Sequence, residues 1–204
     1  MLIVYKRMMA MSGRFQKQMD FLLEIDKIKE IYRQTYIADA SRKENDAEHS
    51  WHSCIMAIVL AEYFDKDIDL LKVIKMMLMH DVVEIYAGDT YCYDDKGNED
   101  KEEREMASAH RVYGLLPEDQ KAEFMAIWRE FEEQKTKEAI FCAILDRVQP
   151  TILNKAANFI SWQEHGIRKE QVLKRNAITF SGPEEIASYM KNLIEKAAED
   201  GYLK

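Results

Sequence analysis

The sequence predicts an all-α protein with a single helical-bundle domain. With only seven Gly and three Pro in 204 residues, the chain has few of the turn residues that an all-β fold requires. It is rich in Lys, Glu, Leu, Ile, Met and Ala, which helices tolerate well. Apolar residues also recur at helical spacing in several segments. The 47% hydrophobic content is sufficient for one sizeable core.

We expect three parts along the chain: a flexible N-terminal extension at 1–14, the main domain at 15–180, and a C-terminal helix at 181–204 that packs on the domain. The first residues do not resemble a secretory signal, because the apolar run is four residues long and Lys6 and Arg7 interrupt it. Met8, Met9 and Met11 are alternative starts, so the sequence leaves open whether residues 1–11 belong to the native protein.

The first helix is predicted over residues 15–36, where apolar side chains recur on one side. Its end carries Arg33, and the following loop carries Arg42. Either arginine could bind an anion or form a surface ion pair. A second helix begins after Asn45, which suits the N-cap, with Glu48 placed for a capping box. His49 then lies in the first turn of a helix that is apolar on most sides and therefore buried.

The third helix contains the stretch 75–89. Successive helical residues turn by roughly 100°, so His80, Asp81 and Glu84 share one arc, and this arc points toward the core. Ionisable groups are rare there unless they are paired or bind a metal. Gly88 suits the turn that ends the helix, and Asp89 follows it. The acidic segment 91–100 is predicted to be a solvated loop or a flap beside the site.

Further helices are predicted over residues 101–113, 117–134, 137–158, 170–180 and 183–201, with a loop or short turn at 162–166. In the long helix 137–158, Asp146 shares its face with small apolar side chains, which leave room for another group. Pro150 has no N–H to give to the carbonyl of Asp146, so we expect a local kink there.

Four groups on three predicted helices stand out: His49, His80, Asp81 and Asp146. Two imidazoles and two carboxylates form a ligand set for one divalent ion of the Mn, Co, Fe, Ni, Zn or Mg group. The alternative is a buried His–Asp pair that only holds helices together.

The net charge of −8, without a long basic run, argues against broad binding to nucleic acid polymers. No apolar run approaches the length of a membrane span. The three Cys are far apart, odd in number and in no metal-binding spacing, which is typical of a reduced, cytoplasmic protein.

The sequence resembles the HD-domain phosphohydrolase superfamily, and more closely a branch related to the bacterial 5′-deoxynucleotidases. The resemblance rests on the segments RKENDAEHSWH (42–52), MHDVVEIYAGD (79–89) and AILDRVQP (143–150), and extends over roughly residues 15 to 165. It implies an HD-domain helical bundle with one metal ion per chain, and usually a homodimer.

At matching positions, the resemblance implies that His49, His80, Asp81 and Asp146 hold the metal. Glu84 would position or activate the attacking water, and Asp89 would reach the sugar side of a nucleotide. Family members carry an Arg-Trp pair before the first motif. This chain has Arg33 in that region but no Trp, so the family's sugar preference does not carry over.

We therefore predict a metal-dependent phosphohydrolase that acts on nucleoside 5′-monophosphates by attack of a metal-bound water on phosphorus. In this prediction Glu84 and Asp89 are catalytic, and Arg33, Arg42 and Asp89 bind the substrate. Guanosine tetraphosphate and cyclic nucleotides are alternative substrates. A di-iron HD oxygenase is a second reading, although the chain has only five His. A non-catalytic helical nucleotide-binding or scaffold protein is the third.

Overall fold

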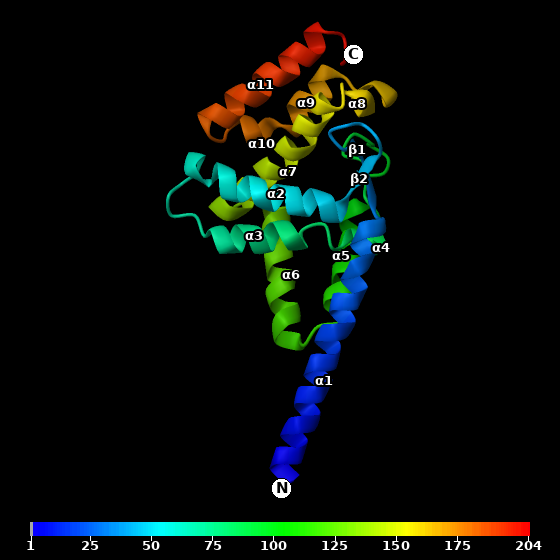
Figure 1. The fold of residues 1–204 in the computed structure, drawn as a ribbon, viewed down its shortest axis with the longest axis vertical. Helices are drawn as coiled ribbons and strands as arrows, with labels where there is room; N and C mark the ends of the chain where they lie inside the picture. Colours follow the sequence, from blue (N-terminus) through cyan, green and yellow to red (C-terminus); the bar gives the residue numbers. More distant parts are fainter. Residues whose placement is uncertain (1) are drawn as a thin grey trace.

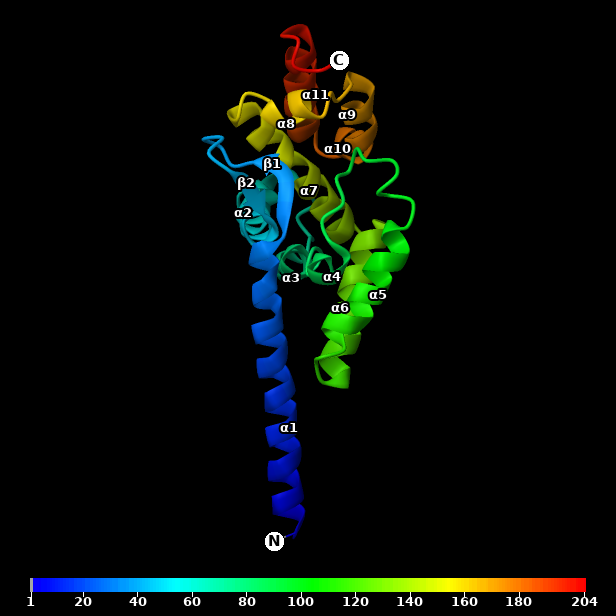
Figure 2. The ribbon, with the colours of Figure 1, turned by 90° about the vertical axis from the view of Figure 1, so that its right-hand side faces the viewer.

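The computed structural model is a bundle of helices with one short β-hairpin at its side (Figures 1 and 2). It describes the side chains of residues 13–204 and, for residues 2–12, only the course of the first helix. The predicted flexible extension at 1–14 therefore lies almost entirely outside the described side chains. The all-α prediction is confirmed apart from the hairpin.

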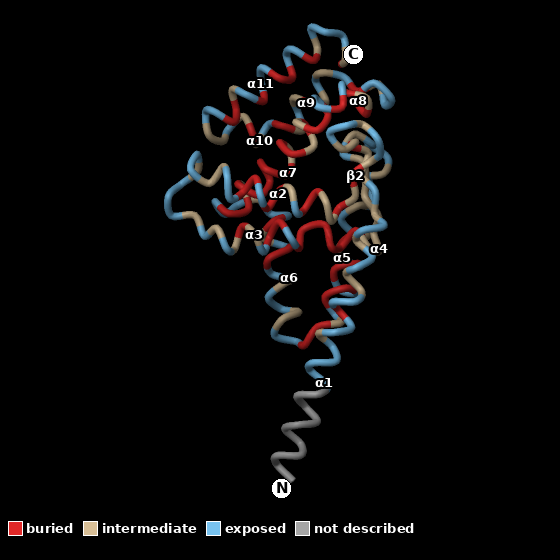
Figure 3. Tube along the Cα trace, in the orientation of Figure 1, coloured by how far each residue is buried: buried red, intermediate tan, exposed pale blue. Residues whose placement is uncertain are grey.

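Three helices form the centre of the fold: α2 (Asp46–Leu60), α3 (Leu70–Met79) and α7 (Lys137–Ala156). They pack against one another around a core that includes Ala57, Met76 and Leu145 (Figure 3). A short 3₁₀ turn, η2 (Ala61–Tyr63), follows α2. Helix α7 runs through Pro150 as one element, and its middle is buried on nearly every side.

The N-terminal part differs from the sequence prediction. Helix α1 (Leu2–Glu24) is followed by the 3₁₀ turn η1 (Ile25–Glu30), and the chain then becomes strand β1 (Tyr32–Tyr36). The predicted helix up to residue 36 is therefore wrong in its last third. Strand β1 pairs antiparallel with β2 (Lys43–Asn45), which runs directly into α2. Residues 32, 35 and 36 are Tyr, Thr and Tyr, which favour strands.

Helices α4 (Glu84–Ala87), α5 (Lys101–Tyr113) and α6 (Glu118–Glu133) form a second layer below the centre in Figure 1. Their core contains Val83, Val112, Tyr113 and Trp128, and Phe21 of α1 packs into it. The segment between α4 and α5 is a loop, as predicted.

The C-terminal part consists of α8 (Ile160–Glu164), α9 (Lys169–Arg175), α10 (Ala177–Phe180) and α11 (Glu184–Glu199). The loop or short turn predicted at 162–166 is helical up to Glu164 and a turn at residues 165 and 166. These helices share a third core, and α11 also contacts α7. None of the described helices is both long and apolar enough to cross a membrane.

Candidate metal centre

His49 lies in the first turn of α2, as predicted. The capping box is present: the Asn45 side chain accepts from the backbone N–H of Glu48, and the Glu48 carboxylate accepts from the N–H of Asn45. The His49 ring is fully buried, and its Nδ1–H donates to Gln149 Oε1 at 2.8 Å. This hydrogen bond fixes the tautomer, so the lone pair of Nε2 faces the opposite side.

His80 and Asp81 lie just after α3, which ends at Met79, and not inside a longer helix as the sequence predicts. The backbone of His80 is nevertheless right-handed helical, so the two side chains still point inward. The Nδ1–H of His80 donates to the carbonyl of Met77 at 2.8 Å, which again leaves Nε2 as the free ring atom.

Asp146 of α7 brings the fourth group to this point. Its Oδ1 lies 3.3 Å from His49 Nε2 and 3.8 Å from His80 Nε2. Asp81 Oδ2 lies 3.1 Å from His80 Nε2 and 3.7 Å from His49 Nε2. The structure therefore brings together all four residues that the sequence selected as ligands.

One ligand atom from each of His49, His80 and Asp81 lies within 4.8 Å of the others, and Asp146 Oδ1 lies close to both histidines, as ligands of a single divalent ion would. Two ligand atoms that each lie about 2.1 Å from a metal are separated by roughly 3.0 to 3.4 Å at octahedral or tetrahedral angles, close to the observed spacings. The Nε2 atoms of His49 and His80 are buried, and neither makes a hydrogen bond of good geometry with the described residues. Buried polar atoms normally have a partner, so their convergence favours a bound cation.

Glu84 opens α4 beside this centre and belongs to a cluster of carboxylates. One carboxylate oxygen from each of Asp46, Asp81 and Glu84 lies within 4.8 Å of the others. Burial, together with Asp81 and Asp46, raises the pKa of Glu84 well above its usual range. Burial and the Asp81 charge likewise raise the pKa of Asp46 to about 7. The raised pKa favours the protonated form of Glu84 in this cluster and makes its ionised form a stronger base than an ordinary carboxylate.

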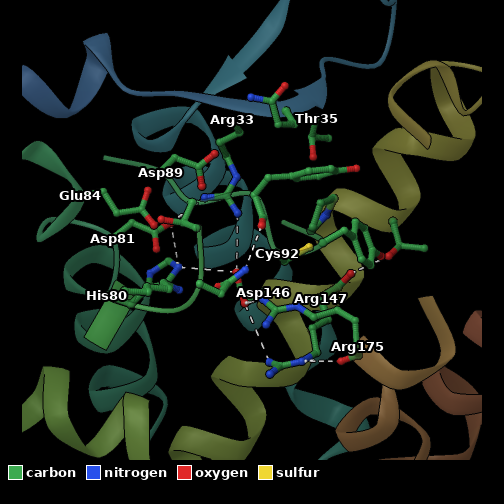
Figure 4. A pocket seen from close by; sticks show the side chains of 18 of the residues that line it. Arg33, Thr35, His80, Asp81, Glu84, Asp89, Cys92, Asp146, Arg147 and Arg175 are labelled. Carbon is green, nitrogen blue, oxygen red and sulfur yellow. Dashed lines mark hydrogen bonds and ion pairs between the residues drawn. The ribbon is translucent and has the colours of Figure 1, made fainter. Parts of the chain in front are cut away.

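Arg33 enters the cluster from β1, from the upper side in Figure 4. Its Nη1 donates to Asp46 Oδ1 at 3.0 Å and to Asp81 Oδ2 at 2.8 Å, and its Nη2 lies 3.9 Å from Asp146 Oδ1. Burial alone would lower the pKa of Arg33, but Asp81 and Asp46 outweigh it and raise the pKa well above the usual value. The guanidinium is therefore a permanent cation within the site.

Of the two remaining residues selected from the sequence, Asp89 lies at the cavity and Arg42 does not. Asp89 lines the cavity just past Gly88, whose φ is +77°. Arg42 lies in the hairpin loop and donates two hydrogen bonds to the Glu48 carboxylate, at 2.7 and 2.6 Å. Its side chain is 48% exposed and is absent from the cavity wall. The structure therefore does not bring Arg42 into the site.

The site opens into a cavity of about 180 Å³. Part of its wall comes from the loop after Asp89, as expected for a flap. Sequence reasoning missed several residues at or behind this cavity. They have partners in distant parts of the chain, and the resemblance assigned a role to none of them: Glu44, Asp46, Arg147, Gln149 and Arg175. Glu44, Asp46, Arg147 and Gln149 lie within the quoted segments, so their position near His49 or Asp146 in the sequence was the one signal available.

The model of the HD domain family matches residues 25–187 of the chain. Among curated proteins, the chain is similar to the 5′-deoxynucleotidase HDDC2 of Bos taurus, with 28% identity over 178 residues, 86% of this chain and 84% of that protein. The human 5′-deoxynucleotidase HDDC2 is 26% identical over 168 residues, 81% and 79% of the two chains.

Among solved structures, a predicted metal-dependent phosphohydrolase from Magnetospirillum magnetotacticum is 45% identical, with a TM-score of 0.89, covering 94% of this chain and 96% of that one. A Pyrococcus horikoshii protein of 21% identity shares the fold with a TM-score of 0.63, over 86% and 99% of the chains. The match over residues 25–187 includes every candidate ligand, so the chain belongs to the HD domain family.

Proposed function

We propose that the protein is a metal-dependent phosphohydrolase that removes the phosphate from nucleoside 5′-monophosphates. The observation that carries the proposal is the convergence of His49, His80, Asp81 and Asp146 on one point at the end of a cavity. The similarity to the 5′-deoxynucleotidases and to the Magnetospirillum phosphohydrolase supports this substrate class.

The four ligands would hold one divalent ion per chain. When bound, such an ion lowers the pKa of a water molecule and offsets phosphate charge. Gln149 and the Met77 carbonyl keep both imidazoles in the tautomer that can ligate. The negative charges of the Asp81 and Asp146 carboxylates would offset the charge of the cation.

The remaining chemistry comes from the chain's own side chains. Glu84 lies within reach of the ligand cluster and, with one buried oxygen unpaired, can accept the proton of the attacking water. Arg33 can hold the phosphate by charge-assisted hydrogen bonds, since its guanidinium already lies between ligand carboxylates. Asp89 also lines the cavity, beside Arg33 in Figure 4, and would accept a hydrogen bond from a sugar hydroxyl.

The test is phosphate release from a panel of ribo- and deoxyribonucleoside 5′-monophosphates, 3′-monophosphates and cyclic nucleotides, with Mn, Co, Mg or Zn added to chelator-treated protein. We expect release from 5′-monophosphates, and its loss in Glu84→Gln. The matched control is Glu195→Gln on α11, an exposed carboxylate that pairs with Lys169. A folded, metal-loaded protein that releases no phosphate from the panel contradicts the proposal.

A di-iron oxygenase is a weaker candidate for this geometry. Within residues 13–204, the candidate metal group contains two imidazoles, those of His49 and His80. His52 instead accepts a hydrogen bond from Gln149, and His165 lies against Tyr91. Metal analysis decides between the two: two irons per chain would favour the oxygenase, and one ion favours the phosphohydrolase.

We also propose that the protein is a homodimer that pairs through α2. The segment from His49 to Ala61 contains no Asp, Glu, Lys or Arg, and Trp51, Ile58 and Val59 are more than half exposed. A contiguous uncharged apolar face is unusual on a monomer, and an identical face can cover it. Light scattering should give twice the chain mass of 24.0 kDa. Ile55→Lys should halve this mass, whereas Tyr189→Lys on α11 should not.

A further inference from the structure

Asp146 is contacted by arginines from two sides. Arg33 of β1 approaches Oδ1, the oxygen nearest to the two histidines, with its Nη2 at 3.9 Å. Arg175, the last residue of α9, donates from its Nη2 to the other oxygen, Oδ2, at 3.1 Å. Figure 4 shows Asp146 between the His80 side of the site and Arg175. Arg175 comes from a part of the chain that carries none of the predicted site residues.

Arg147 lies beside Arg175 but serves a different purpose. Its side chain is 9% exposed, and its Nη1 lies 3.9 Å from Asp146 Oδ2. Its hydrogen bonds go to the Ala143 carbonyl at 2.5 Å, the Arg175 carbonyl at 3.0 Å and Gln134 Oε1 at 3.5 Å. All of these acceptors belong to the protein, so Arg147 fixes the backbone at the end of α9. It thereby holds Arg175 at the cavity wall.

Arg175 has donors to spare. Its side chain lines the cavity and is 36% exposed, and among the described residues its one side-chain hydrogen bond goes to Asp146. A guanidinium carries five N–H donors in a planar fork. Held by one carboxylate oxygen, it can present the others to a ligand without first giving up a partner.

The charge balance of the cavity points the same way. Five carboxylates lie at the centre, those of Asp46, Asp81, Glu84, Asp89 and Asp146. A phosphomonoester brings close to two further negative charges at neutral pH. The cations that line the cavity beside these carboxylates are Arg33, Lys101, Arg147 and Arg175. Lys101 pairs with Glu105, and Arg147 donates to backbone carbonyls, so Arg175 is the cation best able to face an entering phosphate opposite Arg33.

Building on the proposed function, we propose that Arg175 is a second phosphate-binding residue. It binds the substrate's phosphate from the side of the metal centre opposite Arg33. A purely structural alternative exists, in which Arg175 only orients Asp146 as a ligand. If Arg175 binds phosphate, removing its guanidinium lowers the affinity for phosphate. If Arg175 only orients Asp146, removing it lowers the affinity for metal.

The experiment measures binding of inorganic phosphate to the Mn-loaded protein by calorimetry, together with the Mn affinity of each variant. Arg175→Met should weaken phosphate binding by about 10-fold or more, because a charge-assisted hydrogen bond is lost. Arg175→Lys should lose less. Lys174→Met, an exposed charge on the same helix, is the matched control and should change phosphate binding by less than about 2-fold. Circular dichroism checks that each variant is folded.

Unchanged phosphate affinity in folded Arg175→Met overturns the proposal, as does a loss of Mn affinity with normal phosphate binding to the loaded site. Failure of the proposed function looks different. In that case the wild-type protein binds phosphate through Arg175 but hydrolyses no nucleotide. If the enzyme is active, Arg175→Met should raise KM more than it lowers kcat, whereas equal KM values would reject the role of Arg175 alone.

Discussion

Replacing Gln149 by leucine removes the one acceptor that fixes the His49 ring. In the wild-type protein, Gln149 accepts from His49 Nδ1 at 2.8 Å and donates to Glu44 at 2.7 Å, both in the protein interior, and donates to the partly exposed His52 at 3.1 Å. Leucine has a similar volume but no polar atom. Without the acceptor, His49 can take the tautomer with the proton on Nε2, which cannot bind a metal.

Loss of such a supporting hydrogen bond weakens metal binding by about 10- to 100-fold, or roughly 1.4 to 2.7 kcal/mol. Leaving the His49 N–H and a Glu44 oxygen unpaired costs a further ~1 to 3 kcal/mol of folding free energy per group. We therefore expect Gln149→Leu to lower both Tm and metal affinity.

Chelator competition measures the affinity, and imidazole ¹⁵N spectra of the zinc-loaded protein report the tautomer of His49. Gln163→Leu, at an exposed glutamine whose side chain donates to the Asn158 carbonyl, is the matched control. If folded Gln149→Leu binds metal as tightly as the wild-type protein, the assigned role of Gln149 is refuted.

Three further predictions concern single residues. Glu84→Gln should lower kcat by about 10²- to 10⁴-fold with metal affinity retained, as measured by steady-state kinetics and metal titration; unchanged kcat would remove Glu84 from proton transfer. Arg33→Met should lower Tm, because it leaves the buried carboxylate of Asp46 without its cation, and Arg33→Lys should restore part of this loss in a melting experiment. Burial raises the pKa of Glu105 from 4.5 to about 7. As the pH rises through this window, Glu105 ionises more readily in the unfolded chain than in the folded one, so the free energy of unfolding falls by up to about 3 kcal/mol. Glu105→Gln should therefore melt above the wild-type protein at pH 8 and with it at pH 4, and equal Tm values at both would contradict the raised pKa.

The parts of the site that local chemistry determines could be read from the sequence. The capping box of Asn45 and Glu48 involves neighbours three residues apart, so it predicts the start of α2 and the position of His49. The arc argument for His80 and Asp81 also gave the correct side, although α3 ends before them, because His80 keeps helical backbone angles.

Arg33 was selected within a helix that is absent at that point. A stretch with Tyr32, Thr35 and Tyr36 has strand propensity, but a strand of five residues needs its partner β2 to form. Arg42 was selected by its nearness to the first motif, yet it pairs with Glu48 at the surface. Sequence proximity alone did not distinguish these two arginines.

Gln149 and Arg175 could not have been selected from local pattern. Gln149 meets His49 across 100 positions of the chain, and Arg175 meets Asp146 across 29. Both contacts depend on how α7 packs against α2 and on where α9 ends. The predicted cytoplasmic location and the division into parts at residues 14 and 180 stay predictions.

The most direct test of the account is a joint titration of metal and activity. Chelator-treated protein is reloaded stepwise with Mn, and bound metal and phosphate release from a nucleoside 5′-monophosphate are measured in the same samples. Activity should rise in proportion to bound metal and saturate at one ion per chain, with both signals lost in Asp146→Asn. Full activity in the metal-free, folded protein, or saturation only at two ions per chain, would contradict it.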